Sequence, residues 1–309
     1  MPDAPPALLI VNYGSHHLIE ENLARTRLPS GTTVVIVDNF TTHDERLAMR
    51  RACVANGWEM LTPPGNLGFG AGMNVAARAA RDLGADVFIL LNPDAYIEGD
   101  GVVALAEDVA ADHSVMVSPL VNRPDGGHFS SAMELDMATG AVRRLDPRNR
   151  FDESSEWLSG ACLAVHADLW ARVGGFDDDY FLYWEDIDLS VRVVASGGRL
   201  HVNDSVSAVH SAGGTQIRSR RGQTKSPEYY FYNVRNRLVF AAQHLDRGRQ
   251  NQWLRQTAPI AWSVLMRGGK RQLINPLRTF WPIVRGTVSG WRYMKRHRRA
   301  ARGTYRVSR

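Results

Sequence analysis

The sequence predicts an α/β protein, in which helices cover both faces of a mostly parallel sheet, followed by an amphipathic helical extension at the C-terminal end. Three short runs of apolar, largely branched residues indicate buried strands at 7–11, 33–37 and 87–91. Helix-length segments lie between them, at about 16–27, 44–55 and 70–83. This alternation of strand and helix is typical of parallel strands joined by crossover helices.

The second half of the chain is less regular. Residues 120–160, with Gly, Asp and Pro turns around short extended stretches, favour antiparallel strands or a long excursion loop. The later elements are expected in this order: a strand at 160–165, a short helix at 167–173, a helix at 185–195, an extended segment at 200–209, a basic loop at 211–227 and helices beyond Tyr229. The helix at 185–195 opens with acidic residues, which suit the positive end of a helix dipole.

Composition excludes several classes of protein. Of 309 residues, 44% are hydrophobic and 22% charged, so a packed core is expected. The two cysteines, Cys53 and Cys162, lie too far apart and too isolated for a disulfide framework or a zinc finger, and buried reduced thiols are expected. No run of 18 apolar residues occurs, and the first residues lack the pattern of a secretory signal, so we expect a cytoplasmic protein.

Charge is distributed unevenly along the chain. Residues 1–217 carry 15 basic and 30 acidic residues, a net charge of −15, whereas residues 218–309 carry 22 basic and 2 acidic residues, a net charge of +20. We therefore expect an acidic body, residues 1–227, with a nucleotide-binding half at about 1–120 and an acceptor half at about 121–227. A basic, mostly helical region is expected at 228–309.

Polar residues follow each of the first three predicted strands. Asn12 and Tyr13 follow the first strand, Asp38 ends the second, and Asn92-Pro93-Asp94 follows the third. The carboxyl ends of parallel strands line one crevice, where ligands bind. There Asp94 could hold a divalent cation, and Asp38 could accept hydrogen bonds from a ribose or a base, although both also suit plain turns or helix caps.

A glycine-dense turn, residues 66–74, precedes the helix at 70–83 and would let a ligand approach the backbone closely. A dinucleotide-binding fingerprint would require this turn directly after the first strand. A dehydrogenase is therefore disfavoured.

The segment from Tyr183 to Arg192 places three carboxylates, those of Glu185, Asp186 and Asp188, at a helix start behind an aromatic run. Carboxylates beside aromatic surface suit a site that holds a sugar and removes a proton from its hydroxyl, although an acidic first helical turn alone explains the pattern too. His210 ends a predicted strand and could be a metal ligand or a structural histidine.

Together these segments resemble the inverting glycosyltransferases of family 2, which have the Rossmann-like GT-A fold, and in particular their bacterial rhamnosyltransferase-like branch. The resemblance covers about residues 7–245. Its motifs are Asn12-Tyr13, Val37-Asp38-Asn39, Asn66 to Asn74, Asn92 to Asp94, Gly174 to Asp177 and Tyr180 to Arg192. Asn92 stands where the family's metal motif begins with Asp, which leaves its part in metal or ribose contact open.

The resemblance implies a role for each matching residue. Asp186 is implied as the catalytic base, and Mg²⁺ or Mn²⁺ is expected on Asp94 and His210. Contacts with the nucleotide sugar are implied for Asn12, Tyr13, Asp38, Asn66, Gly70, Asn92 and Asp94. Contacts with the acceptor are expected from Trp184, Glu185 and Asp188.

The sequence thus predicts a metal-dependent inverting transfer from a nucleoside-diphosphate sugar, with dTDP-rhamnose as the first expectation and UDP-linked sugars as alternatives. The acceptor expected is a cell-envelope glycan or a polyprenyl-diphosphate-linked sugar. Three arginines of the basic loop, Arg218, Arg220 and Arg221, could close on the diphosphate or remain solvated. A catalytically silent sugar-binding protein on the same fold is the alternative, and no nucleic-acid partner is expected.

The basic tail predicts an attachment to the inner face of the cell membrane. Its apolar residues at helical spacing form one stripe, Leu277, Phe280, Trp281, Val284, Val288 and Trp291, flanked by Arg278, Arg285 and Arg292. This layout is typical of a helix that lies on an anionic membrane surface. Packing of the helix on its own catalytic domain is the alternative.

Overall fold

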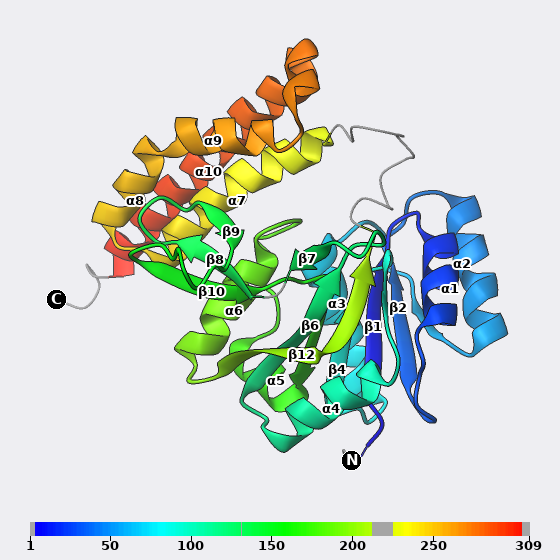
Figure 1. Ribbon diagram of the computed structural model, residues 1–309. Coiled ribbons are helices and arrows are strands. Elements are labelled where there is room, and N and C mark those ends of the chain that lie inside the picture. The colour runs from blue at the N-terminus through cyan, green and yellow to red at the C-terminus, as the bar shows by residue number, and fades with distance from the viewer. Residues whose placement is uncertain (1–3, 131, 212–224, 305–309) are drawn as a thin grey trace.

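The computed structural model describes residues 4–130, 132–211 and 225–304 and has a central sheet with helices on both faces (Figure 1). Its strands are β1 (Ala7–Asn12), β2 (Thr33–Asp38), β3 (Glu59–Leu61), β4 (Val87–Leu91), β5 (Ala95–Ile97), β6 (Val115–Asn122), β7 (His128–Ser130), β8 (Ala132–Asp136), β9 (Val142–Arg144), β10 (Ser154–Leu158), β11 (Cys162–His166) and β12 (Arg199–His210). Its helices are α1 (His16–Arg25), α2 (His43–Asn56), α3 (Phe69–Asp82), α4 (Gly101–Ala111), α5 (Ala167–Val173), α6 (Glu185–Ala195), α7 (Pro227–His244), α8 (Arg247–Arg255), α9 (Thr257–Met266) and α10 (Pro276–Thr304), with a 3-10 turn, Lys270–Ile274, before α10.

The main sheet has the strand order β3-β2-β1-β4-β11-β6-β12-β5, with β7 beside β6. The pairs β1 with β2, β1 with β4, β2 with β3 and β6 with β12 are parallel. β11 runs against both of its neighbours, and β5 runs against β12. A strand that is buried on both faces has the same apolar sequence in either direction, so its orientation could not be predicted.

Burial explains the apolar strand sequences. β1 and β4 are buried along their whole length. One core cluster joins the sheet to α1, α2 and α4 through residues such as Ile19, Met49 and Leu105. A second cluster joins the opposite face to α3, α5 and α6, which confirms the predicted helices on both faces.

The structure also has elements that the sequence pattern does not predict. Residues 95–122 form β5, α4 and β6; β5 is only three residues long, and α4 is apolar on most sides and so lacks a clear stripe. Within 120–160, the chain forms the antiparallel sheet β10-β8-β9, as expected. Cys53 and Cys162 are free and buried, as predicted, and burial raises the pKa of the Cys53 thiol to about 11.

A third core cluster connects the C-terminal helices to the rest of the molecule. Tyr180, Trp184 and Ile187 pack with Leu238 to Ala242 of α7 and with Trp253 of α8. Figure 1 shows α7 to α10 as a helical layer beside the small sheet β8 to β10. This cluster includes residues from both sides of position 227, so the two predicted regions share one core here. The boundary at 227 stays a prediction.

Helix α10 packs on α7 through small residues. A Cβ atom at Gly286 would lie 2.4 Å from the carbonyl oxygen of Phe231, and one at Gly290 would lie 2.8 Å from that of Arg235. The two helices therefore approach closely on this side. Among the described residues, no helix is long and apolar enough to cross a bilayer.

Candidate active site

The carboxyl ends of β1, β2 and β4 lie at one edge of the sheet, so the polar residues that follow these strands lie there too. Asn12 and Asp38 are register partners in the parallel pair of β1 and β2. The Asn12 side chain donates a hydrogen bond from Nδ2 to Asp38 Oδ1 over 2.9 Å, and both side chains are buried. Tyr13 follows with half of its side chain exposed, so its ring is open to a ligand.

Arg46 of α2 covers the Asp38 carboxylate. Its Nε donates to Asp38 Oδ2 over 2.6 Å, and its Nη2 donates to the carbonyl oxygens of Asp38 and Pro63 over 3.1 Å. Asp38 is fully buried beneath this guanidinium. A nucleotide could therefore reach that carboxylate only if Arg46 moved, and Arg46 itself is the more accessible group. Arg46 is not among the site residues predicted from the sequence.

The glycine-dense turn lies beside the end of β2, where the Asn39 side chain donates a hydrogen bond to the carbonyl oxygen of Gly68 over 2.7 Å. Asn66 is exposed, and its Oδ1 accepts a hydrogen bond from the backbone N–H of Gly68, which shapes the turn. Gly70 is buried, and a Cβ there would lie 2.8 Å from the Cβ of Phe176. The absence of a side chain at Gly70 thus lets α3 pack closely against Phe176. We had expected it to let a ligand approach the backbone.

Asp94 and His210 lie together, as expected for a shared site. β5 and β12 pair so that His210 is opposite Ala95, and His210 Nε2 lies 3.0 Å from Asp94 Oδ1. The Asn92 amide is next to them, with 3.4 Å between its Nδ2 and His210 Nε2. The side chains of Asp94 and His210 are mostly buried. These three groups therefore form one polar cluster at the end of β4.

This cluster fits a small divalent cation. An octahedral ion with bonds of about 2.1 Å places neighbouring ligand atoms about 3.0 Å apart, the distance found between Asp94 Oδ1 and His210 Nε2. Carboxylate oxygen and imidazole nitrogen are both ligands that Mn²⁺ accepts. The nitrogen of the Asn92 amide faces His210. A 180° rotation of the amide would bring its oxygen, which can bind a cation, to the same position.

Asp186 lies in the first turn of α6 and is partly buried. Its Oδ2 accepts a hydrogen bond from the backbone N–H of Gly160 over 3.0 Å, and its Oδ1 accepts one from that of Ile187. Burial raises the pKa of Asp186 to about 6, against the opposing effect of these backbone donors. A carboxylate with a pKa near 6 is suited to take a proton at neutral pH.

Glu185 lies beside Asp186 and is buried. Burial, with the negative charges of Asp186 and Asp188, raises the pKa of Glu185 well above its usual value. Its Oε2 has no hydrogen-bond partner among the described residues. Glu185 Oε2 can therefore form a hydrogen bond with a polar group of a ligand.

The turn before α6 is strained. Tyr183 and Trp184 have φ angles of 67° and 78°, the left-handed region that side chains other than glycine rarely adopt. Asn236 of α7 is fully buried, and its Nδ2 donates to the carbonyl oxygens of Leu182 and Tyr183 over 2.9 and 2.7 Å. A residue 50 positions further along the chain thus holds the turn that leads into Asp186.

Two residues expected at the acceptor site have other surroundings. Trp184 is buried and packs against Phe240 and Trp253. Asp188 is also buried; His244 Nε2 lies 2.7 Å from its Oδ1, and Arg192 lies 2.6 Å from its Oδ2. Both side chains are therefore occupied by supporting contacts, which differs from the acceptor contact that we expected. Arg218, Arg220 and Arg221 lie outside the described residues.

Comparisons with known proteins agree with this geometry, although no protein-family model matches the chain. The chain is 30% identical over 228 residues to an N-acetylglucosaminyl-diphospho-decaprenol L-rhamnosyltransferase of Mycobacterium tuberculosis, an alignment that spans 64% of this chain and 72% of the relative. It belongs to the glycosyltransferases of family 2. Within this family it lies in the rhamnosyltransferase-like branch: a rhamnosyltransferase of Escherichia coli is 24% identical over 221 residues, which span 66% of this chain and 83% of that protein.

Solved structures confirm that this glycosyltransferase has the GT-A fold. A mannosyltransferase from Pyrobaculum calidifontis, in complex with GDP-Man and Mn²⁺, matches with a TM-score of 0.55 and 17% identity over 94% of this chain and 88% of that one. GalNAc-T7 with UDP, GalNAc and Mn²⁺ matches with a TM-score of 0.57 and 14% identity. That match spans 85% of this chain and 56% of the other, longer chain.

Proposed function

We propose that this glycosyltransferase is metal-dependent and inverting, and that it moves rhamnose from dTDP-rhamnose to a polyprenyl-diphosphate-linked sugar or another cell-envelope glycan. The observation that carries the proposal is that two adjacent residues, Gly160 and Ala161, join the two groups that the reaction needs. The backbone N–H of Gly160 binds Asp186, the proposed base, which has a pKa of about 6, and the carbonyl oxygen of Ala161 binds the backbone of Asn92, beside Asp94 and His210. Asp186 can take the proton of the acceptor hydroxyl, and a cation on Asp94 and His210 would bind the diphosphate.

In the proposed reaction, Asp186 takes the proton of the acceptor hydroxyl, and the resulting oxygen attacks the anomeric carbon of the donor. The bond from that carbon to the diphosphate breaks on the opposite side, so the configuration inverts in one displacement. Asp94 and His210, with Asn92 beside them, would hold Mg²⁺ or Mn²⁺, which when bound supplies positive charge for the departing diphosphate. Arg46 and Tyr13 would line the nucleoside part of the crevice.

The acceptor side is proposed to use Glu185, whose Oε2 can still form a hydrogen bond. Trp184 and Asp188 are proposed to hold the start of α6 in place: Trp184 packs against Trp253, and Asp188 pairs with His244. The names of the Mycobacterium and Escherichia relatives support rhamnose as the sugar, and the Mycobacterium name supports a polyprenyl-diphosphate-linked acceptor. The Mn²⁺ in the two structural neighbours supports the proposed metal.

A nucleotide panel tests the donor side. We expect dTDP with Mn²⁺ to raise the thermal midpoint more than UDP or GDP does, since only a ligand bound by the folded state stabilises it. Transfer from dTDP-rhamnose to a synthetic prenyl-diphosphate-linked N-acetylglucosamine should follow, and the product should show an inverted anomeric configuration by NMR. Equal midpoints with and without all three nucleotides, together with no transfer, would overturn the proposal.

We also propose that the enzyme attaches to the inner face of the cell membrane through α10. The face of α10 that contacts α7 contains Gly286, Gly290 and Met294, whereas large apolar side chains lie on the outside. These exposed residues are Leu277, Phe280, Trp281, Val284, Val288 and Trp291. Helix packing thus leaves the apolar stripe in solvent, with exposed Arg278, Arg285 and Arg292 beside it.

An exposed stripe of this composition suits an anionic bilayer surface. Arginine side chains near such a surface each contribute about 1 kcal/mol, and tryptophan favours the interface between water and lipid. A polyprenyl-linked acceptor would be reached at the same surface. A soluble acceptor would need no such stripe, so membrane binding and acceptor class are linked in this proposal.

A further inference from the structure

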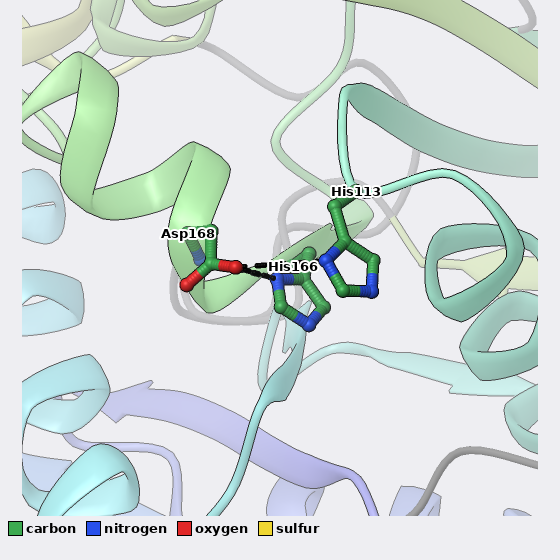
Figure 2. Close-up of side chains that lie close together, drawn as sticks. All are labelled: His113, His166 and Asp168. Carbon is green, nitrogen blue, oxygen red and sulfur yellow. Dashed lines mark hydrogen bonds and ion pairs between the residues drawn. The ribbon is translucent and has the colours of Figure 1, made fainter.

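Three side chains of types that can bind a metal lie close together (Figure 2). They are beside the start of β4, since His166 pairs with Val87, whereas Asn92 follows the other end of that strand. His113 lies in the connection between α4 and β6, His166 is the last residue of β11, and Asp168 is in the first turn of α5. β11 begins beside the crevice, since the backbone of Asn92 bonds to that of Ala161, and it ends at His166. The cluster is therefore separated from the catalytic groups by the length of a strand.

The spacing of the three ligand atoms is that of a coordination sphere. Asp168 Oδ2 lies 3.4 Å from His166 Nδ1 and 3.5 Å from His113 Nδ1. Both distances are longer than the usual 2.7–3.2 Å of a hydrogen bond from nitrogen to oxygen. A tetrahedral ion with bonds of about 2.0–2.1 Å places its ligand atoms about 3.3–3.4 Å apart, which agrees with these separations.

The two imidazole rings are already turned towards the same carboxylate. They are stacked, with their centroids 3.5 Å apart and an angle of 10° between their planes. His166 Nδ1 accepts a hydrogen bond from the backbone N–H of Asp168 over 3.2 Å, so this nitrogen is unprotonated, and an ion would replace that hydrogen bond at its single lone pair. His166 is buried, whereas half of the His113 side chain is exposed, so the His113 ring can tilt out of the stack towards an ion.

Charge around the cluster does not oppose a cation. The cluster contains one carboxylate, and Arg81, which acts on His166 from α3, is itself paired with Asp86. Two imidazoles and one carboxylate are the donors that Zn²⁺ and its neighbours Co²⁺ and Ni²⁺ prefer, whereas Mg²⁺ prefers oxygen ligands alone.

We propose that His113, His166 and Asp168 bind one divalent transition-metal ion of the Zn²⁺ class, with water as the fourth ligand. The ion would connect two segments that are 53 positions apart in sequence, the loop before β6 and the start of α5. Its role would be structural, because it lies at the edge of the sheet away from Asp94 and Asp186. This proposal does not depend on the proposed function.

Zinc titration of the full-length protein tests the proposal. The protein is stripped with a chelator and titrated with Zn²⁺ in excess Mg²⁺. Because Asp94 and His210 could also hold Zn²⁺, the titration is repeated with His210→Ala. We expect this variant to bind one equivalent of Zn²⁺, which should raise its thermal midpoint, since an ion bound by the folded state stabilises it. Co²⁺ in place of Zn²⁺ should give the visible absorption of a four-coordinate ion, and His113→Ala should abolish this band.

Variants identify the ligands. His113→Ala and Asp168→Asn change exposed side chains, so both should fold. Each should weaken Zn²⁺ binding at least tenfold, since even the loss of a residue that only supports a metal ligand costs about 10- to 100-fold in affinity. His201→Ala removes another exposed histidine, on β12, and should bind Zn²⁺ as the parent does. Equal affinity in all three variants would overturn the proposal. So would the absence of saturable Zn²⁺ binding in the parent.

Discussion

Asn236 of α7 donates a 2.7 Å hydrogen bond to the carbonyl oxygen of Tyr183, three positions before Asp186. The backbone at Tyr183 and Trp184 is left-handed, which costs about 1–3 kcal/mol for each residue. Such strain persists when the surroundings enforce it, and the buried Asn236 amide is one of the groups that do so. The C-terminal region therefore contributes to the position of the proposed base.

Asn236→Ala should lower kcat by about 10- to 100-fold with little change in the donor KM, because misplacement of a reacting group by about 1 Å can cost that much. The measurement is a full kinetic profile against donor concentration and pH. Asn233→Ala is a matched control, since the Asn233 side chain donates a hydrogen bond within α7, to the carbonyl oxygen of Tyr229, and has no other hydrogen-bond partner in the part of the chain that the structure describes. Equal loss in both variants would point to a general effect on α7.

The raised pKa of Asp186 predicts how the rate depends on pH. A base must be deprotonated to act, so kcat/KM for the acceptor should fall as the pH drops through about 6, with one proton taken up. The measurement is kcat/KM for the acceptor at saturating donor from pH 5 to 8. A rate that stays constant down to pH 5 would argue against Asp186 as the base.

The same shift predicts an effect on stability. The pKa of Asp186 is higher in the folded state than in the unfolded state, where it is near 3.8, so the folded state is destabilised as the pH rises from about 4 through about 6. Asp186→Asn removes the buried charge, but its amide nitrogen must then face one of the two backbone N–H donors, that of Gly160 or that of Ile187. We therefore expect the Tm of this variant, relative to that of the parent, to rise between pH 4 and pH 7.5, as differential scanning calorimetry at both pH values would detect.

Asp94→Ala and His210→Ala should each weaken the Mn²⁺ dependence of nucleotide binding, because both side chains are proposed to surround one cation. Calorimetry of dTDP binding with and without Mn²⁺ measures this linkage. His201→Ala should leave it unchanged. Intact linkage in His210→Ala would return His210 to a structural role beside Asp94.

The exposed face of α10 can be tested without truncation, which would uncover the core that α7 shares with Trp253 and Met294. Leu277→Ser, Trp281→Ser and Trp291→Ser in one variant should lower partitioning onto anionic liposomes at least tenfold, since each large apolar side chain contributes about 1 kcal/mol or more when buried. Val54→Ser removes an exposed apolar residue of α2 and serves as the control. Equal cosedimentation of all three proteins would contradict the membrane proposal.

The sequence predicts Asp94 and His210 at one edge of the sheet, because each follows or ends a strand and the carboxyl ends of parallel strands gather there. Their contact depends on the pairing of β12 with β5, a strand that the sequence pattern does not predict. The same reasoning predicts Asn12 and Asp38 at one edge of the sheet, and in the structure they are register partners of β1 and β2. Such contacts follow from backbone topology, which the apolar strand pattern indicates.

Other features depend on contacts between distant segments and could not be predicted. The cover that Arg46 provides over Asp38 depends on how α2 returns to the sheet. The surroundings of Asp188 depend on His244, 56 positions further along the chain. A left-handed turn at Tyr183 and Trp184 has no sequence signal, since neither residue favours positive φ.

The most direct test of the account is the rate of rhamnose transfer by Asp186→Asn, measured together with its affinity for dTDP and Mn²⁺. The amide keeps the shape of the side chain but cannot take the acceptor proton. We predict transfer slower by about 10²–10⁴-fold with nucleotide affinity within a few-fold of the parent. Transfer within a few-fold of the parent would contradict the assignment of Asp186 as the base.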